Sequence, residues 1–268
     1  MSNVILTQSF ILQESQASRP LNHARIGWHN LGREAEWTAT SESPEFEAES
    51  LRNDMTLRRW RSEDLVASIT AEFDGLKEMD YVALAAHNLS GSLVSVEYLD
   101  GDLDEFLEIT ELVPANNNSA MILFAPVTTT QIRINITHTT PPEIGVAYVG
   151  RVLEMERAFY GGHTPVTLSR QTRILSTRGR TGQFLGRSRI ARGYATSYEW
   201  QNLRAAWYRQ NFDPFVEHAT VAPFFIAWNP LRFPDEVAYG WVNDDIAPTN
   251  QGVRDLMSVG FSMEAFRD

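Results

Sequence analysis

The 268-residue sequence predicts a mainly β protein, in which an N-terminal jelly-roll β-sandwich is followed by a second β domain with a long hairpin and one packed helix. Three observations predict this architecture. Short β-prone runs alternate with turn-forming clusters through about the first 150 residues. Two longer alternating runs flank the turn sequence RGRTG in the second part. Apolar residues at helical spacing come after these runs.

The first part contains five short β-prone runs. Two of them, Leu93–Leu99 and Gln131–Thr137, alternate clearly between apolar and polar residues. The other three are Val82–Ala86, Ala120–Phe124 and Gly145–Val149. Turn-forming clusters separate the runs at His87–Ser92, Asp100–Asp104, Asn116–Ser119 and Thr139–Pro142. Short strands at this spacing are typical of a β-sandwich or jelly roll, and no long helix is predicted here.

The sequence pattern changes near residue 155, from short β-prone runs to longer alternating runs. We expect a first domain of residues 1–155 and a second domain of residues 156–268. The sequence GGHTP at Gly161–Pro165 combines flexible and rigid residues, as domain-entry turns do.

The second part is expected to begin with a long hairpin. Its strands are predicted at Thr172–Thr177 and Gln183–Leu203, around a turn at Arg178–Gly182. An amphipathic helix is predicted at about Trp200–Gln210 or slightly later, with an unsettled boundary to the preceding strand. Three further strands are predicted at Phe224–Trp228, Glu236–Val242 and Val259–Phe266.

The composition excludes several classes of function. The chain has no cysteine, so disulfides, iron–sulfur clusters and cysteine zinc sites are ruled out. Its six histidines are scattered and form no i,i+4 pair, so we expect no metal site. No phosphate-binding loop, dinucleotide fingerprint, nucleophile elbow or HExxH motif occurs. We therefore expect no enzymatic activity and no cofactor.

Charge and hydropathy also limit the partners. The formal net charge is −11, so the surface as a whole should not attract nucleic acid or an anionic membrane. No stretch approaches the roughly 20 apolar residues that a membrane helix needs, so no membrane partner is expected. The N-terminus has no basic region and does not read as a signal peptide.

Two acidic segments are candidate sites. The first has the spacing of a calcium loop at Asp100, Asp102, Asp104 and Glu111. Glu105 stands where that loop needs glycine, which favours a solvated acidic turn over a weak calcium site. The second, Asp244–Asp245, could supply a carboxylate for sugar hydrolysis, but adjacency alone favours a surface turn.

The charge is unevenly distributed. Between Arg151 and Arg209 there are eleven arginines and three acidic residues, a net of +8, so the remainder carries −19 to give −11. The arginines could face acidic surfaces of neighbouring subunits, contact nucleic acid or line a solvated strand. The first interpretation is favoured. The candidate subunit-interface or channel residues are Arg173, Arg178, Arg180, Arg187, Arg189 and Arg192.

About residues 25–155 resemble the galactose-binding-like, discoidin-type jelly roll. The positions that carry the resemblance are Trp37, Thr38–Ser41, Leu51, Trp60, Val82–Leu84 and His87–Leu89. This resemblance implies the sandwich fold. A sugar platform of Trp28, His29, Trp60 and Arg61 is one expectation, and large aromatic residues that anchor a core are the favoured alternative.

The second part of the chain, from the sequence VGRVLEMERAFYGGHTPVTLSR onward, resembles tail-tip proteins of long-tailed phages, near the distal-tail and baseplate-hub proteins. The resemblance implies a tail-tube-like second domain that forms a ring around the tail channel and joins the tail tube to more distal tip proteins. It implies a virion protein made in the host cytoplasm. The implied partners are further copies of the chain, as a hexamer or alternatively a trimer, together with tail-tube, tape-measure and hub proteins and DNA passing through the channel. The alternative function is carbohydrate binding to a host glycan.

Overall fold

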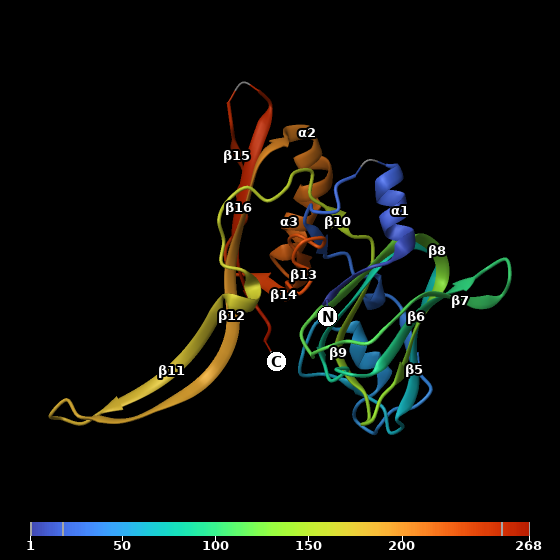
Figure 1. Cartoon of the computed structure of the whole chain (residues 1–268), viewed down its shortest axis with the longest axis horizontal. Helices are drawn as coiled ribbons and strands as arrows, with labels where there is room; N and C mark the ends of the chain where they lie inside the picture. The colour runs from blue at the N-terminus through green and yellow to red at the C-terminus, as the bar shows by residue number, and fades with distance from the viewer. Residues whose placement is uncertain (1, 18, 253, 268) are drawn as a thin grey trace.

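The computed structural model describes residues 2–17, 19–252 and 254–267. The protein is mainly β, as predicted, with two eight-stranded sheets. Figure 1 shows a compact body from which one long hairpin, β11–β12, extends. Every strand predicted from the sequence lies within a strand of the structure, to within one residue at either end.

The first sheet is an almost entirely antiparallel arrangement with the order β4-β9-β5-β8-β6-β7. In addition, β3 pairs with β5, and β1 pairs in parallel with β8. The strands are β1 (Val4–Leu6), β3 (Glu36–Ala39), β4 (Trp60–Arg61), β5 (Val66–His87), β6 (Leu93–Asp100), β7 (Glu105–Leu112), β8 (Ala120–Thr137) and β9 (Glu143–Gly150).

The long strands β5 and β8 make this sheet a sandwich. Val66–Glu72 pairs with the second half of β8, whereas the segment from Tyr81 pairs with its first half, and the register is broken between Glu72 and Lys77. β3 and β6 extend the first of these pairings, and β9 and β1 extend the second. The two halves therefore form two layers, and apolar side chains from both layers fill one core between them.

The second sheet has the order β10-β2-β13-β14-β16-β12-β11, with β15 also paired to β16. Its strands are β2 (Arg25–Gly27), β10 (Leu153–Glu154), β11 (Arg170–Arg178), β12 (Phe184–Arg204), β13 (Phe224–Ala227), β14 (Val237–Val242), β15 (Thr249–Asn250) and β16 (Leu256–Ala265). Two of these strands, β2 and β10, precede residue 155. The division of the chain at that residue stays a prediction, but the second sheet draws strands from both sides of it.

One short helix follows β1 and packs against the sandwich, and one helical segment packs on the second sheet. Helix α1 (Gln8–Gln16) is capped by Thr7, whose hydroxyl accepts a hydrogen bond from the Phe10 N–H at 3.2 Å. The second segment runs through α2 (Ala205–Trp207), a π-helical turn and α3 (Asp213–Ala219). Single-turn helices lie at Leu31–Arg33, Ala48–Arg52 and Val166–Leu168.

The helix predicted at about Trp200–Gln210 or slightly later begins at Ala205 in the structure. Strand β12 continues through Trp200 and Leu203 because both residues pair with β16. Tertiary pairing therefore overrides the helical spacing of the apolar residues at this boundary. No helix among the described residues is long and apolar enough to cross a membrane.

The sandwich and the second sheet are packed against each other. Tyr81 and Tyr148, on the outer face of one sandwich layer, lie in an apolar cluster with Phe225 and Tyr239 of the second sheet. The Tyr148 hydroxyl donates to a carboxylate oxygen of Asp54 at 2.6 Å. That layer is thus buried on both faces, which explains the unbroken apolar run VALAA in β5.

Candidate functional site

The hairpin that leaves the body is the main candidate site. We call residues 170–192, which comprise β11, its turn and the first part of β12, the arm. All nine residues of β11 are exposed, and so is almost all of the arm's other strand (Figure 1). Gly182, with a φ of 84°, supplies the left-handed conformation that the turn requires. An isolated two-stranded hairpin is marginally stable in water, so the arm has little support of its own.

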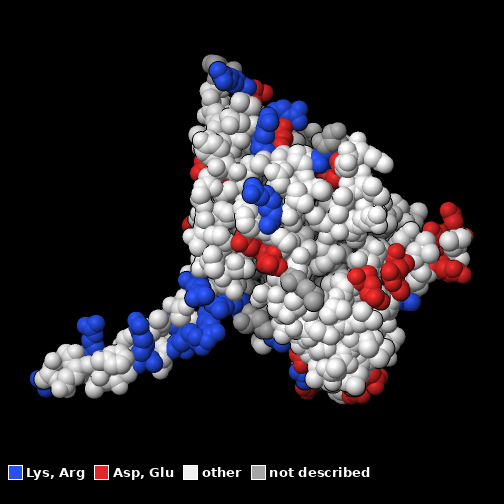
Figure 2. All heavy atoms as spheres, in the orientation of Figure 1, with Lys and Arg blue, Asp and Glu red and all other residues white. Residues whose placement is uncertain are grey.

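The six arginines predicted as interface or channel residues all lie on the arm. None of them forms an ion pair with any residue that the structure describes. Arg187 makes one side-chain hydrogen bond, from Nε to the Ser176 hydroxyl at 3.1 Å. Figure 2 shows basic side chains along the arm without an acidic one, in agreement with the sequence of residues 170–192.

Apolar side chains on the arm are exposed as well, a feature that the charge pattern did not reveal. Phe184 is 68% exposed and Leu185 is 64% exposed. The others are Ile174, Leu175 and Ile190. A protruding surface that combines apolar and arginine side chains has the composition of a protein–protein interface.

The four residues of the expected sugar platform do not form one surface, so that prediction is wrong. Trp60 is 0% exposed in the sandwich core, where its Nε1 donates to the Ser41 carbonyl at 3.1 Å. Trp28 is half-buried beside the helical segment, with its ring 5.2 Å from that of His218. His29 is exposed next to it. The core interpretation therefore holds for Trp60.

Arg61 belongs to a different, partly exposed cluster on the sandwich. Its guanidinium lies 4.2 Å from the centre of the Phe46 ring and 2.8 Å from a carboxylate oxygen of Glu143. Arg59 approaches the same carboxylate at 3.4 Å. Together these residues present charged hydrogen-bonding groups beside an aromatic ring.

The buried histidine of the sandwich is structural. His87 lies next to a loop, where its Nε2 is 3.0 Å from the Asn118 carbonyl and its Nδ1 accepts from the Leu89 N–H at 3.3 Å. Both ring nitrogens are therefore used, with Nε2 as the donor. Burial lowers the pKa of His87 to about 4, so the ring is neutral at physiological pH.

The acidic segments are surface features. The Asp100 carboxylate accepts the backbone N–H groups of Asp102 and Leu103 at 2.9 and 3.1 Å, which closes the predicted acidic turn. Within the described residues, no group of three or more histidine or acidic side chains is placed to hold a metal ion.

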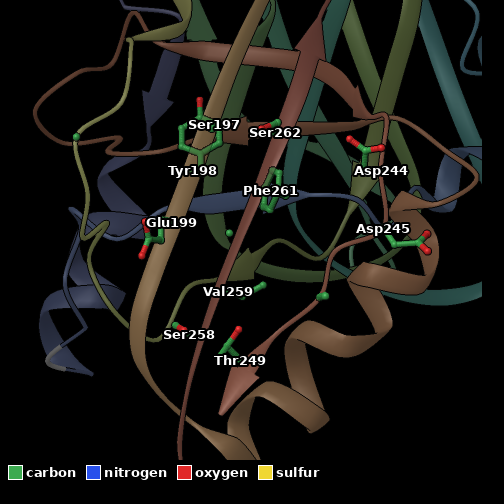
Figure 3. A pocket seen from close by; sticks show the side chains of 13 residues that line it. Ser197, Tyr198, Glu199, Asp244, Asp245, Thr249, Ser258, Val259, Phe261 and Ser262 are labelled. Carbon is green, nitrogen blue, oxygen red and sulfur yellow. The ribbon is translucent and has the colours of Figure 1, made fainter. Parts of the chain in front are cut away.

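A polar groove of about 500 Å³ lies on the outer face of the second sheet. Figure 3 shows Glu199 of β12 on one side of it and the Asp244–Asp245 loop on the other. All three side chains are exposed to solvent. Ser197, Ser258 and Ser262 also line the groove. Because the groove is wide and shallow, it does not enclose a substrate as catalytic pockets do.

Known proteins resemble this chain in structure but not in sequence. No family model matches the sequence, and no curated protein matches it. Among solved structures, chitosan-binding module 1 of a chitosanase/glucanase from Paenibacillus sp. IK-5 is similar with a TM-score of 0.41 and 18% identity, covering 45% of this chain and 98% of the module. The family 32 carbohydrate-binding module of Clostridium perfringens NanJ, solved with galactose, is similar with a TM-score of 0.41 and 16% identity, covering 47% of this chain and 98% of that one.

Proposed function

We propose that this protein is a structural subunit that assembles with copies of itself, the arm of one copy lying on the surface of the next. The observation that carries the proposal is the arm, on which exposed apolar side chains lie beside arginines that form no ion pair with any described residue. Covering the apolar groups would contribute about 25 cal/mol per Å² of surface removed from water.

The charge distribution supports the same arrangement. The segment that contains the arm is +8, and the rest of the chain is −19. A positive arm that meets a negative body gives a head-to-tail contact between copies. Such contacts close into a ring when the rotation between copies is suitable. A ring of six copies, or alternatively three, at a phage tail tip is the assembly that the sequence resemblance implies.

The arm's apolar residues provide the direct test. The triple variant Ile174→Ser, Leu175→Ser and Phe184→Ser should convert the assembled protein to monomer in sedimentation velocity and remove rings from negative-stain images. The far-ultraviolet circular dichroism should not change, because all three side chains are already exposed.

A matched control removes exposed apolar groups elsewhere on the surface. Leu57→Ser with Val221→Ser changes side chains that are 87% and 83% exposed and lie outside the arm. This variant should assemble like the wild type. Wild-type protein that stays monomeric with its neighbouring tail proteins present would refute the proposal, as would full assembly of the arm variant.

Carbohydrate binding by the sandwich is the second candidate function. The cluster of Arg59, Arg61, Glu143 and Phe46 favours it, because charged hydrogen-bonding groups beside an aromatic ring suit a sugar's hydroxyls and its apolar face. This cluster replaces the platform expected from the sequence.

Removal of the Arg61 side chain tests this candidate on a glycan array and by calorimetry with galactose. If the cluster binds sugar, Arg61→Ala should weaken binding about tenfold or more, since a hydrogen bond to a charged group is lost. Arg133→Ala is the matched control, because Arg133 also lies over a phenylalanine ring, that of Phe106, at 3.4 Å. Absence of binding by the wild type to every glycan would exclude the candidate.

A further inference from the structure

The two sheets each end in a long strand with one unpaired edge. Among the described residues, strand β7 pairs only with β6, and β11 pairs only with β12. With eight and nine residues, they are the longest edge strands in the described part of the chain. An open edge presents a row of unpaired N–H and C=O groups on which a strand of another chain can pair.

The two edges have opposite charge. The charged residues of β11 (RQTRILSTR) are all arginines, and those of β7 (EFLEITEL) are all glutamates. Both strands also carry two adjacent apolar residues, Ile174–Leu175 in the middle of β11 and Phe106–Leu107 near the start of β7. In an antiparallel alignment that places Arg173 opposite Glu108, these apolar pairs face each other.

We propose that β11 of one copy pairs antiparallel with β7 of the next, so that the sandwich of one subunit and the second sheet of its neighbour become one continuous sheet. The register joins Arg173 with Glu108, Ile174 with Leu107, Leu175 with Phe106 and Ser176 with Glu105. This pairing rests on the proposed function and names the surface that receives the arm.

The proposed β11–β7 register uses parts of both strands that contain no bulge. β7 has a bulge at Ile109, since Glu108 and Thr110 face neighbouring residues of β6. The register shifts in the arm fall on β12, where Ile190 and Leu185 are the extra residues, so β11 itself is regular. Glu105–Glu108 can therefore pair without interruption, and beyond the bulge Glu111 lies near Arg170.

Opposite charge selects this pairing over the pairing of like edges. Two β11 strands would bring only arginines together, and two β7 strands would bring only glutamates together. Like charges across a strand pair are destabilising, whereas opposite charges stabilise it. The glutamates and the bulge also protect β7 from uncontrolled pairing, as is usual for exposed edges.

The positions of the two edges suit a head-to-tail assembly. The arm and the β6–β7 hairpin leave the body on opposite sides (Figure 1). Figure 2 shows basic groups on the arm and acidic groups at the β6–β7 hairpin. A subunit therefore offers β11 to one neighbour and β7 to the other, which is the arrangement of a ring with heterologous contacts.

Charge reversal tests the pairing. Arg173→Glu and Glu108→Arg should each weaken self-association in sedimentation velocity about tenfold or more, because like charges then meet across the contact. The double variant Arg173→Glu with Glu108→Arg should restore it. Arg173→Glu with Asp102→Arg is the control and should not. A wild type that assembles while the double variant shows no recovery would overturn the pairing and leave the proposed function intact.

Cross-linking tests the register. The chain has no cysteine, so a pair can be introduced without background. Ile174→Cys with Leu107→Cys should give disulfide-linked multimers on non-reducing gels, because opposite residues of an antiparallel pair lie within disulfide range. Ile174→Cys with Leu93→Cys is the matched control, since Leu93 is also a leucine of the sandwich and its side chain is exposed outside β7. Equal cross-linking of both pairs, or none of the first, contradicts the register.

Discussion

Replacement of Trp60 with alanine is expected to lower the free energy of unfolding by about 3–5 kcal/mol. The side chain is 0% exposed and lies in the apolar core between the two sandwich layers. Its removal leaves a large cavity. The Ser41 carbonyl also loses the hydrogen bond that the indole N–H donates. Urea denaturation followed by circular dichroism measures the loss.

Trp241→Ala is the control, because Trp241 is 38% exposed on β14. This change is expected to lower the free energy of unfolding by about 1 kcal/mol or less, as surface substitutions do. If Trp60→Ala left the denaturation midpoint unchanged, the core position of the tryptophan would be wrong. In that case Trp60 would again be a candidate for contact with a ligand.

Trp60 also shows what the sequence could not decide. A tryptophan next to arginine in WRS fits both an exposed platform and a core anchor, because its neighbours in sequence do not determine which face of a two-residue strand is buried. The answer depends on β9, which pairs with β4 and lies more than 80 residues further along the chain. Burial of a side chain in a short strand is thus set by distant residues.

Other elements could be predicted from local patterns. The strands within β6 and the second half of β8 were predicted because one of their faces is apolar and the other polar. Strand β7 was not predicted, since its glutamates recur at every third residue and obscure the alternation. Helix α1 was also missed, because its polar residues leave only a weak apolar stripe around Phe10.

Of the two proposed contact surfaces, one could be predicted from the sequence and the other could not. The arm was predicted because its arginines, its turn and its two strands are adjacent in the sequence. The complementary edge of β7 could not be predicted, because only the sheet order shows that β7 is unpaired on one side. The arm is thus encoded by local sequence, and the surface proposed to receive it is created by tertiary structure.

A buried ion pair connects the two sheets. Arg25 of β2 is 1% exposed, and its guanidinium lies 3.0 Å from a carboxylate oxygen of Glu14 in α1 and 3.4 Å from one of Glu154 in β10. Burial lowers the pKa of Arg25, and burial also raises that of Glu154. Because α1 packs on β8 of the sandwich, the cluster ties that sheet to the second one.

Arg25→Met is expected to lower the free energy of unfolding by about 3–5 kcal/mol, because it removes the buried partner of the Glu14 carboxylate and leaves only the half-exposed Arg19 at 3.5 Å. The double variant Arg25→Met with Glu14→Leu should recover much of this loss, since it replaces the pair by apolar groups of similar size. Urea denaturation of both variants measures the difference.

The control is an exposed pair of the same chemistry. Arg52 and Glu49 are 45% and 53% exposed, so Arg52→Met should change the free energy of unfolding by about 1 kcal/mol or less. An equal effect of Arg52→Met and Arg25→Met would show that burial does not determine the contribution of Arg25.

The apolar cluster around Tyr148 also joins the two sheets. We therefore expect the two sheets of the Arg25→Met variant to unfold together, in one transition at a lower urea concentration than in the wild type. Two separate transitions in this variant would mean that the remaining apolar contact around Tyr148 does not couple the sheets by itself.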